Sequence, residues 1–187
     1  MDGATIDAAQ VEAIAELDAE PFALDGLQNW QLQDQLIAAQ RHAVDHGQPR
    51  IEALHDALER FQGQGVLAMG AFGERMRDAL ADPMEALFNA YEEALTAWPH
   101  ALPDAQVQFE AHGLTLEEPL GELRQDEAGQ RCRLLLLSSS LISQGSGRGQ
   151  YRWSHLLRPW VAHLAGNLSG PMTTLLLSKA GHVTLEP

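Results

Sequence analysis

The spacing of apolar residues changes from helical to alternating close to Pro99 and Pro103. Before this point apolar residues recur at helical spacing, as in MEALFNAYEEALTAW (84–98). After it they alternate or form short runs, as in AQVQFEA (105–111) and RCRLLLL (131–137). Helical spacing directs one helix face to a core, whereas alternation directs one strand face there. The sequence therefore predicts an α+β protein, with a helical subdomain over 1–98 and a β-rich core over 99–187.

The first part is expected to contain helices at 26–45, 50–62, 74–81 and 83–98, with Asp25 as an N-cap. Pro83 suits the first turn of the last helix, because proline lacks a backbone donor. The apolar, glycine-rich segment 66–73 is expected to be a packed connector. The apolar seam of 83–98 indicates a core-facing helix and not a cofactor site.

Within 99–187, the sequence predicts strands at 105–111, at about 114–125 and at 131–137, with DEAGQ (126–130) as a turn. Gly129 is available there for positive φ. A helix is expected at about 152–165, followed by a hairpin around Ala180 and Gly181. The predicted order is β-β-β-α-β-β.

Acidic and basic residues are distributed unevenly along the chain. Residues 1–127 contain 25 acidic and 6 basic side chains, whereas residues 128–187 contain six basic residues and one acid, Glu186. Two readings stay open: the surfaces face different partners, or they attract each other within the fold. No apolar run approaches the ~20 residues of a membrane helix, so no membrane partner is expected. A single cysteine, Cys132, expected to be buried and inert, and the absence of a readable signal peptide favour a cytoplasmic protein.

The histidines and glycines predict no metal, cofactor or catalytic residue. His42 and His46 have a metal-compatible spacing on a helix, but no third ligand is evident. His155 and His163 are expected to be exposed or core residues. The GSGRG loop (145–149) lacks the Lys-Ser/Thr of a Walker A loop, and no GxSxG elbow is present.

The residues that follow the leucine-rich strand 131–137 indicate whether the sheet could carry the active site of a magnesium nuclease. Such an enzyme needs carboxylates at strand ends and a nearby lysine. The strand instead leads into Ser138–Ser140, and no carboxylate occurs between Glu127 and Glu186. The only lysine, Lys179, has Leu177 two positions before it, where an acid-x-Lys element requires an acid. Neutral hydroxyl groups bind Mg²⁺ weakly, so cleavage by this route is not expected.

Two stretches, EPFALDGLQNWQLQDQLI (20–37) and GVLAMGAFGE (65–74), resemble the C-terminal domain of RecC, the gamma chain of exodeoxyribonuclease V. They differ from the family pattern mainly at Ala68 and Met69, where a proline-containing pair is expected. From about residue 105 the likeness lies in the order of elements more than in residues. The family continues with further helices and strands, so we expect the chain to be a fragment of a larger subunit.

The resemblance implies a restriction-endonuclease-like core without an active site, in a non-catalytic domain. It also implies assembly with RecB-like and RecD-like subunits, which repair double-strand breaks and meet DNA within the complex. The domain is expected to hold that complex together and to guide separated strands. Arg148 and Arg152, which flank the glycine-rich loop, are the expected phosphate contacts. Trp98 and Trp160 are expected in the core, with interface anchoring as the alternative.

Two other functions stay open at this point. One is an active metal nuclease that uses carboxylates of the acidic part, such as Glu110, Glu118 or Asp126. The other is a stand-alone helical adaptor whose sheet is incidental. Cleavage of linear DNA and co-expression with RecB-like and RecD-like chains separate these alternatives.

Overall fold

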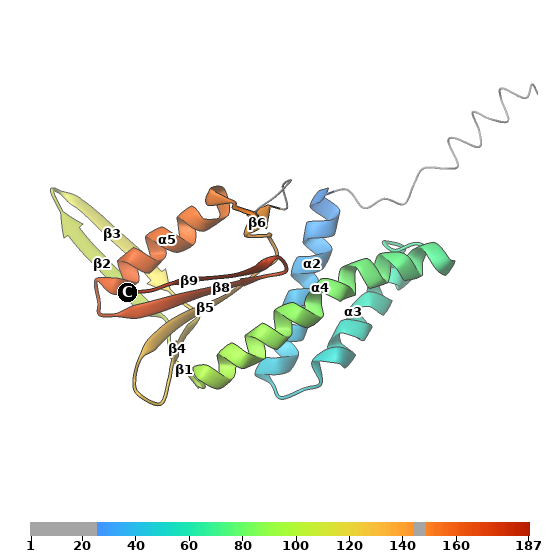
Figure 1. Ribbon diagram of the computed structural model, residues 1–187, viewed down its shortest axis with the longest axis horizontal. Helices are drawn as coiled ribbons and strands as arrows, with labels where there is room; N and C mark the ends of the chain where they lie inside the picture. Colours follow the sequence, from blue (N-terminus) through green and yellow to red (C-terminus); the bar gives the residue numbers. More distant parts are fainter. Residues whose placement is uncertain (1–25, 144–148) are drawn as a thin grey trace, which may run out of the picture.

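The computed structural model describes residues 26–143 and 149–187, and Asp25 therefore lies outside the described residues. Three helices, α2 (Gly26–Asp45), α3 (Arg50–Gly63) and α4 (Gly70–Ala97), form a layer on one side of the molecule. The strands and helix α5 (Trp153–Asn167) lie on the other side (Figure 1). The predicted α+β class and the order of a helical part before a β-rich part are confirmed.

The helical layer is held by one apolar cluster. Each helix contributes residues at helical spacing, and the cluster also includes Leu134 and Leu177 from two strands. Packing of this kind, more than intrinsic propensity, stabilises helices of this length. The buried helical residues include Leu32, Leu36 and Ile37 of α2, Leu54, Leu58 and Phe61 of α3, and Leu80, Met84, Leu87, Phe88 and Tyr91 of α4.

Helix α4 does not stop before Pro83. The expectation of two helices, 74–81 and 83–98, is wrong, because one helix runs from Gly70 to Ala97 with Pro83 inside it. A proline in a helix interior costs about 3 kcal/mol. The buried seam continues across it, from Leu80 on one side to Met84 and Leu87 on the other. Burial of this seam outweighs the cost of the missing backbone hydrogen bond.

The connector between α3 and α4 is shorter than predicted, because α4 already begins at Gly70. Gly70 has φ of +70°, a conformation that glycine adopts readily. At Gly73 a Cβ atom would stand 1.8 Å from the carbonyl oxygen of Ala68. Glycine is therefore favoured at position 70 by the positive φ, and at position 73 by the nearby carbonyl oxygen.

Five strands form the main sheet, in the order β1-β4-β5-β8-β9. The central strands β5 (Arg131–Leu137) and β8 (Met172–Ser178) run parallel, and α5 lies in the connection between them. The other pairs are antiparallel. They involve the strands β1 (His100–Ala101), β4 (Leu123–Gln125) and β9 (Gly181–Leu185). The predicted strand at 131–137, the turn with Gly129 at φ +83° and the final hairpin are confirmed.

The strand expected at 114–125 is divided in two. Strand β3 (Leu114–Leu120) pairs with β2 (Ala105–Ala111) as a separate two-stranded sheet, and β4 joins the main sheet. Glu122, at φ +63°, lies at the bend between β3 and β4. Alternation alone does not reveal such a bend, because apolar residues continue on both sides of it. A third small sheet pairs β6 (Ile142–Ser143) with β7 (Gln150–Tyr151).

The central strands direct alternate leucines to opposite faces. Leu134 and Leu136 of β5, with Leu177 of β8, pack against the helical layer. Leu135 and Leu137 instead pack with Leu141, Leu156 and Leu176, which lie toward α5. The main sheet therefore has a helical-layer face and an α5 face. Across 26–143 and 149–187, no helix combines the length and apolarity needed to cross a membrane.

Candidate functional site

The candidate site lies where the parallel strands β5 and β8 end, on the helical-layer face. Ser138 and Lys179 follow these strands, and the register pairs Leu137 with Ser178. The Ser138 hydroxyl donates to the carboxylate of Asp34 on α2, at an Oγ–Oδ1 distance of 3.0 Å. The Lys179 Nζ donates to Oε1 of Gln33, 2.6 Å away. Helix α2 thus supplies both partners, from positions more than 100 residues earlier.

Lys179 carries the positive charge at this site. Burial of its amine lowers the lysine pKa, and the positive charge of Arg152 lowers it further. Its hydrogen-bond partner Gln33 is a neutral amide that is itself buried. The lysine ammonium is therefore hydrogen-bonded to a neutral amide.

Leu177 occupies the position where an acid-x-Lys element carries its acid. Only 2 % of this residue is exposed, and it belongs to the apolar cluster of the helical layer. An ionised carboxylate there would be removed from water among apolar side chains, which costs several kcal/mol or forces it to be neutral. Packing therefore explains why leucine stands at this position.

Asp34 is a site residue that sequence reasoning missed. The sequence has no carboxylate between Glu127 and Glu186, but α2 brings one to Ser138. One signal was present in the sequence: Gln33 and Gln40 interrupt the buried, otherwise apolar stripe of α2. A buried amide at such a position indicates a polar partner nearby.

Histidines and acids elsewhere do not join this site. Over the described ranges, no group of three or more His, Cys, Asp or Glu side chains is placed to hold a metal ion. The His42 and His46 rings lie 4.1 Å apart on the exposed side of α2, and Nδ1 of His46 is 2.7 Å from the His42 carbonyl oxygen. Their contact is therefore local to one helix turn.

Of the two readings for His163, exposed or core, the structure shows the core position. The residue is 4 % exposed, and its ring nitrogens lie 3.0 Å from Thr174 Oγ1 and 3.1 Å from the Glu186 carbonyl oxygen. His155 is half-buried, with Nδ1 3.2 Å from the Ser140 carbonyl oxygen. Both rings have structural partners that connect α5 to neighbouring segments.

The acids considered for an active nuclease lie apart from Lys179. Glu110 is exposed in the separate β2–β3 sheet. Asp126 accepts the backbone N–H groups of Ala128 and Gln130, at 3.0 and 2.7 Å, in the turn that precedes β5. That turn lies at the opposite end of β5 from Ser138. The side chain of Glu118 lies outside the described residues.

One of the two arginines predicted to contact phosphate lies next to the site. Arg152 is exposed, directly precedes α5, and is close enough to influence Lys179 electrostatically. Its backbone N–H donates to the Leu141 carbonyl at 2.8 Å, which fixes the start of α5. Arg148 lies outside the described residues.

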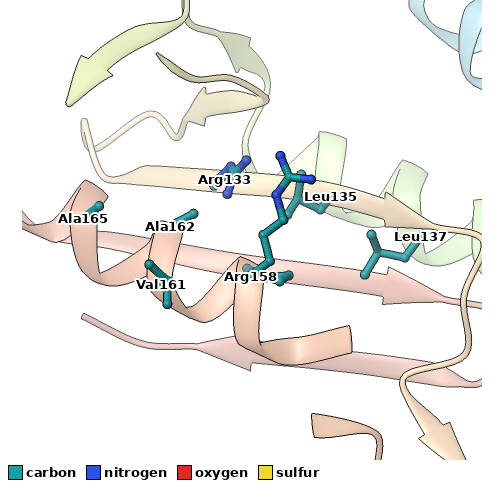
Figure 2. A pocket seen from close by; sticks show the side chains of 8 residues that line it. Arg133, Leu135, Leu137, Arg158, Val161, Ala162 and Ala165 are labelled. Atoms are coloured by element: carbon teal, nitrogen blue, oxygen red, sulfur yellow. The ribbon is translucent and has the colours of Figure 1, made fainter. Parts of the chain in front are cut away.

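A groove of about 530 Å³ opens on the α5 face of the sheet, between β5 and α5 (Figure 2). We call it the α5 groove; it is lined by Arg133, Leu135, Leu137, Arg158, Pro159, Val161, Ala162 and Ala165. Trp160 on the same helix is 48 % exposed, so the expectation that it is a core residue is wrong. Only one side of α5 meets the sheet, which explains the difference. Trp98 is half-buried and packs against the helical-layer cluster, as expected.

Comparison with known families matches this chain to one of them. A family model described as the RecC C-terminal domain matches residues 8–186, nearly the whole chain. The search of curated proteins gave no match. RecC is a subunit of the RecBCD helicase–nuclease, exodeoxyribonuclease V, which acts in DNA repair and recombination. The matched range includes the helical layer, the main sheet and α5, and the chain therefore belongs to the RecC C-terminal domain family.

Proposed function

We propose that this chain is a non-catalytic structural and DNA-guiding domain of a RecBCD-type complex, assembled with RecB-like and RecD-like subunits. The observation that carries the proposal is the end of the β5–β8 pair, where Leu177 is buried and Lys179 donates to the amide of Gln33. A restriction-endonuclease-like core would place its metal ligands at such strand ends. Here a buried leucine stands where the acid would be, and the lysine is hydrogen-bonded to a neutral amide.

The chemistry of divalent cations supports the non-catalytic assignment. Mg²⁺ in proteins is bound through carboxylates, water and substrate phosphates in octahedral geometry. Asp34 is the one carboxylate hydrogen-bonded at this strand end among the described residues, and it already accepts the Ser138 hydroxyl. Lys179 is hydrogen-bonded to the neutral amide of Gln33 and not to a carboxylate that could share a metal ion. We infer that the strand pair retains a nuclease-like shape after the loss of cleavage.

The division into 1–98 and 99–187 is proposed as two parts of one domain. Leu134 and Leu177 of the sheet are buried in the same cluster as Leu36 and Phe88 of the helices. The Arg41 guanidinium on α2 also pairs with the carboxylate of Glu122 at the β3–β4 bend. Separation of the parts would expose this shared apolar surface.

For subunit assembly we propose that the acidic outer surface of α4 faces a protein partner. Glu85 and Glu93 are exposed there and lie outside the buried seam of the helix. Co-expression with RecB-like and RecD-like chains is expected to yield a co-purifying heterotrimer. Glu85→Lys combined with Glu93→Lys should reduce the recovered complex, whereas Glu110→Lys on the β2–β3 hairpin should not. A chain that joins neither subunit would support the stand-alone adaptor instead.

For DNA guidance we propose that Arg148 and Arg152 contact phosphate groups once the complex has assembled. The isolated chain, at a net charge of −14, is expected to bind DNA weakly at physiological salt. Within the complex, Arg152→Glu should weaken binding to all sequences and reduce the salt dependence by about one counterion. Arg75→Glu on α4 is the matched control. Nanomolar DNA binding by the isolated chain would contradict this proposal.

A further inference from the structure

The outward side of α5 exposes a stripe of large apolar residues. Trp153 is 75 % exposed and Leu157 is 61 % exposed, and Val161 and Leu164 continue the stripe along the helix. These residues recur at intervals of three and four, so they share one face. Val161 also lines the α5 groove, which makes stripe and groove one continuous surface. A contiguous apolar surface of this kind is typical of a binding site.

The charge of this surface is positive. Arg133 and Arg158 both line the groove, and Figure 2 shows the Arg158 side chain extending across it. The Nε of Arg133 donates to the Gly121 carbonyl at 3.1 Å, which holds this guanidinium beside the groove. From residue 128 onward the chain contains a single acid, Glu186. The surface therefore suits a ligand that combines apolar side chains with carboxylates.

The chain itself contains a segment with this chemistry. Residues 1–25, MDGATIDAAQVEAIAELDAEPFALD, include seven acidic residues and no lysine or arginine. Apolar residues such as Val11, Ile14 and Leu17 stand between these acids. The RecC C-terminal domain model matches from residue 8, so most of this segment belongs to the same domain unit.

The connection to α2 brings this segment within reach of the groove. Asp34 is hydrogen-bonded to Ser138, which directly follows the groove residue Leu137. Gly26, where α2 begins, is eight residues earlier, or about 12 Å along the helix axis. A segment of 25 residues spans up to about 80 Å when extended. It is therefore long enough to pass the end of the sheet and follow α5, whose 15 residues measure about 22 Å.

We propose that residues 1–25 bind along the α5 groove, with apolar side chains on the exposed stripe and carboxylates toward Arg133 and Arg158. A second copy of the chain, which also has an acidic surface, is the alternative occupant of the groove. The tethered segment has the advantage, because its effective concentration is about millimolar, whereas a second copy must lose translational and rotational freedom. The proposal concerns an interaction within the chain and does not depend on the proposed function.

Disulfide trapping in the full-length chain tests this binding. Cys132 is fully buried, so it does not compete with introduced cysteines. Val161→Cys is combined in turn with Val11→Cys, Ile14→Cys and Leu17→Cys, and each pair is oxidised at low protein concentration. At least one pair should form an intramolecular disulfide about tenfold faster than the same segment cysteine with Ala86→Cys, an exposed control on α4. Non-reducing gels and intact mass measure the products.

Charge variants test whether the disulfide trapping depends on the basic residues of the α5 groove. Arg158→Glu or 1 M NaCl should slow the trapping, whereas the matched control Arg75→Glu on α4 should leave it unchanged. Equal rates at positions 161 and 86 would overturn the proposal, as would the absence of trapping in all three pairs. Covalent dimers as the main product would also overturn it, and would identify a second copy as the occupant.

Discussion

The two faces of the main sheet are built from the same leucine-rich strands but differ in how they are covered. On the helical-layer face, Leu134 and Leu177 are 3 % and 2 % exposed beneath α2 and α4. On the α5 face, Leu135 and Leu137 border an open groove. Figure 1 shows the corresponding arrangement, with α2, α3 and α4 on one side of the sheet and α5 on the other.

The two faces differ in what their side chains contact. The helical-layer face ends in Ser138 and Lys179, whose partners come from α2. Leu177, which stands two positions before Lys179, is buried on this face. The α5 face keeps exposed apolar and basic side chains, so it has the properties of a binding surface.

The largest expected difference between the faces concerns stability. Leu177→Ala should lower the free energy of unfolding by about 2–5 kcal/mol, because it removes buried methyl groups and leaves a cavity. Leu137→Ala, at the open groove, should cost less than about 1.5 kcal/mol. Urea unfolding of both variants measures the two values. Equal losses would show that the two faces are equally well packed.

The second prediction concerns pH, through the thiol of Cys132 on β5. Burial raises its pKa from 9.0 to about 11. Because the folded state then holds this proton more tightly, its contribution to stability is complete below pH 9 and is lost as pH rises toward 11. The loss amounts to about 2–3 kcal/mol. Urea unfolding at pH 8 and pH 11 should show that loss of unfolding free energy in the unsubstituted chain. Cys132→Val, which has no thiol, should lose less stability between the two pH values. Identical pH profiles of the two chains would refute the prediction.

A third test concerns the place where α5 does pack closely on the sheet. A Cβ at Gly166 would stand 2.4 Å from Met172 Cε and 2.8 Å from Leu120 Cδ2. Gly166→Ala should therefore cost about 1–2 kcal/mol, since only flexible side-chain ends need to move. Gly63→Ala, where nothing lies within 4 Å, is the matched control. Thermal unfolding of both variants measures the contrast, and a neutral Gly166 variant would show that α5 is loosely held.

The smallest effect is expected for the ion pair between the helical layer and the β3–β4 bend. Arg41 and Glu122 are 35 % and 36 % exposed, and such pairs contribute about 1 kcal/mol or less. A double-mutant cycle with Arg41→Ala and Glu122→Ala should give a coupling energy in that range, which decreases in 1 M NaCl. A coupling of several kcal/mol would place this pair among the main contacts between layer and sheet.

Much of the fold could be predicted from local pattern. The helix at 26–45, the strands at 105–111 and 131–137, and the turn at Gly129 are all found where the spacing of apolar residues and the glycine placed them. The errors occur where contacts distant in sequence outweigh a local rule. Pro83 is tolerated because buried residues flank it, and the bend at Glu122 assigns β3 and β4 to different sheets.

The candidate site was only partly predictable. Lys179, Leu177 and the serines follow from the sequence alone, because they lie at the ends of recognisable strands. Asp34 and Gln33 do not, because they reach the site through packing of α2 against the sheet. The exposed side of α5 could not be predicted from the sequence either. Its apolar residues have the same spacing as those of a buried helix, and spacing does not show which face a neighbour covers.

Incubation with DNA and metal tests the central claim, that the end of the β5–β8 pair is structural and not catalytic. Linear duplex and single-stranded DNA are incubated with the chain in Mg²⁺ or Mn²⁺. The account predicts no cleavage above a protein-free control. Cleavage that disappears in both Asp34→Asn and Lys179→Ala, but persists in Asp126→Asn, would contradict it and assign catalysis to this site.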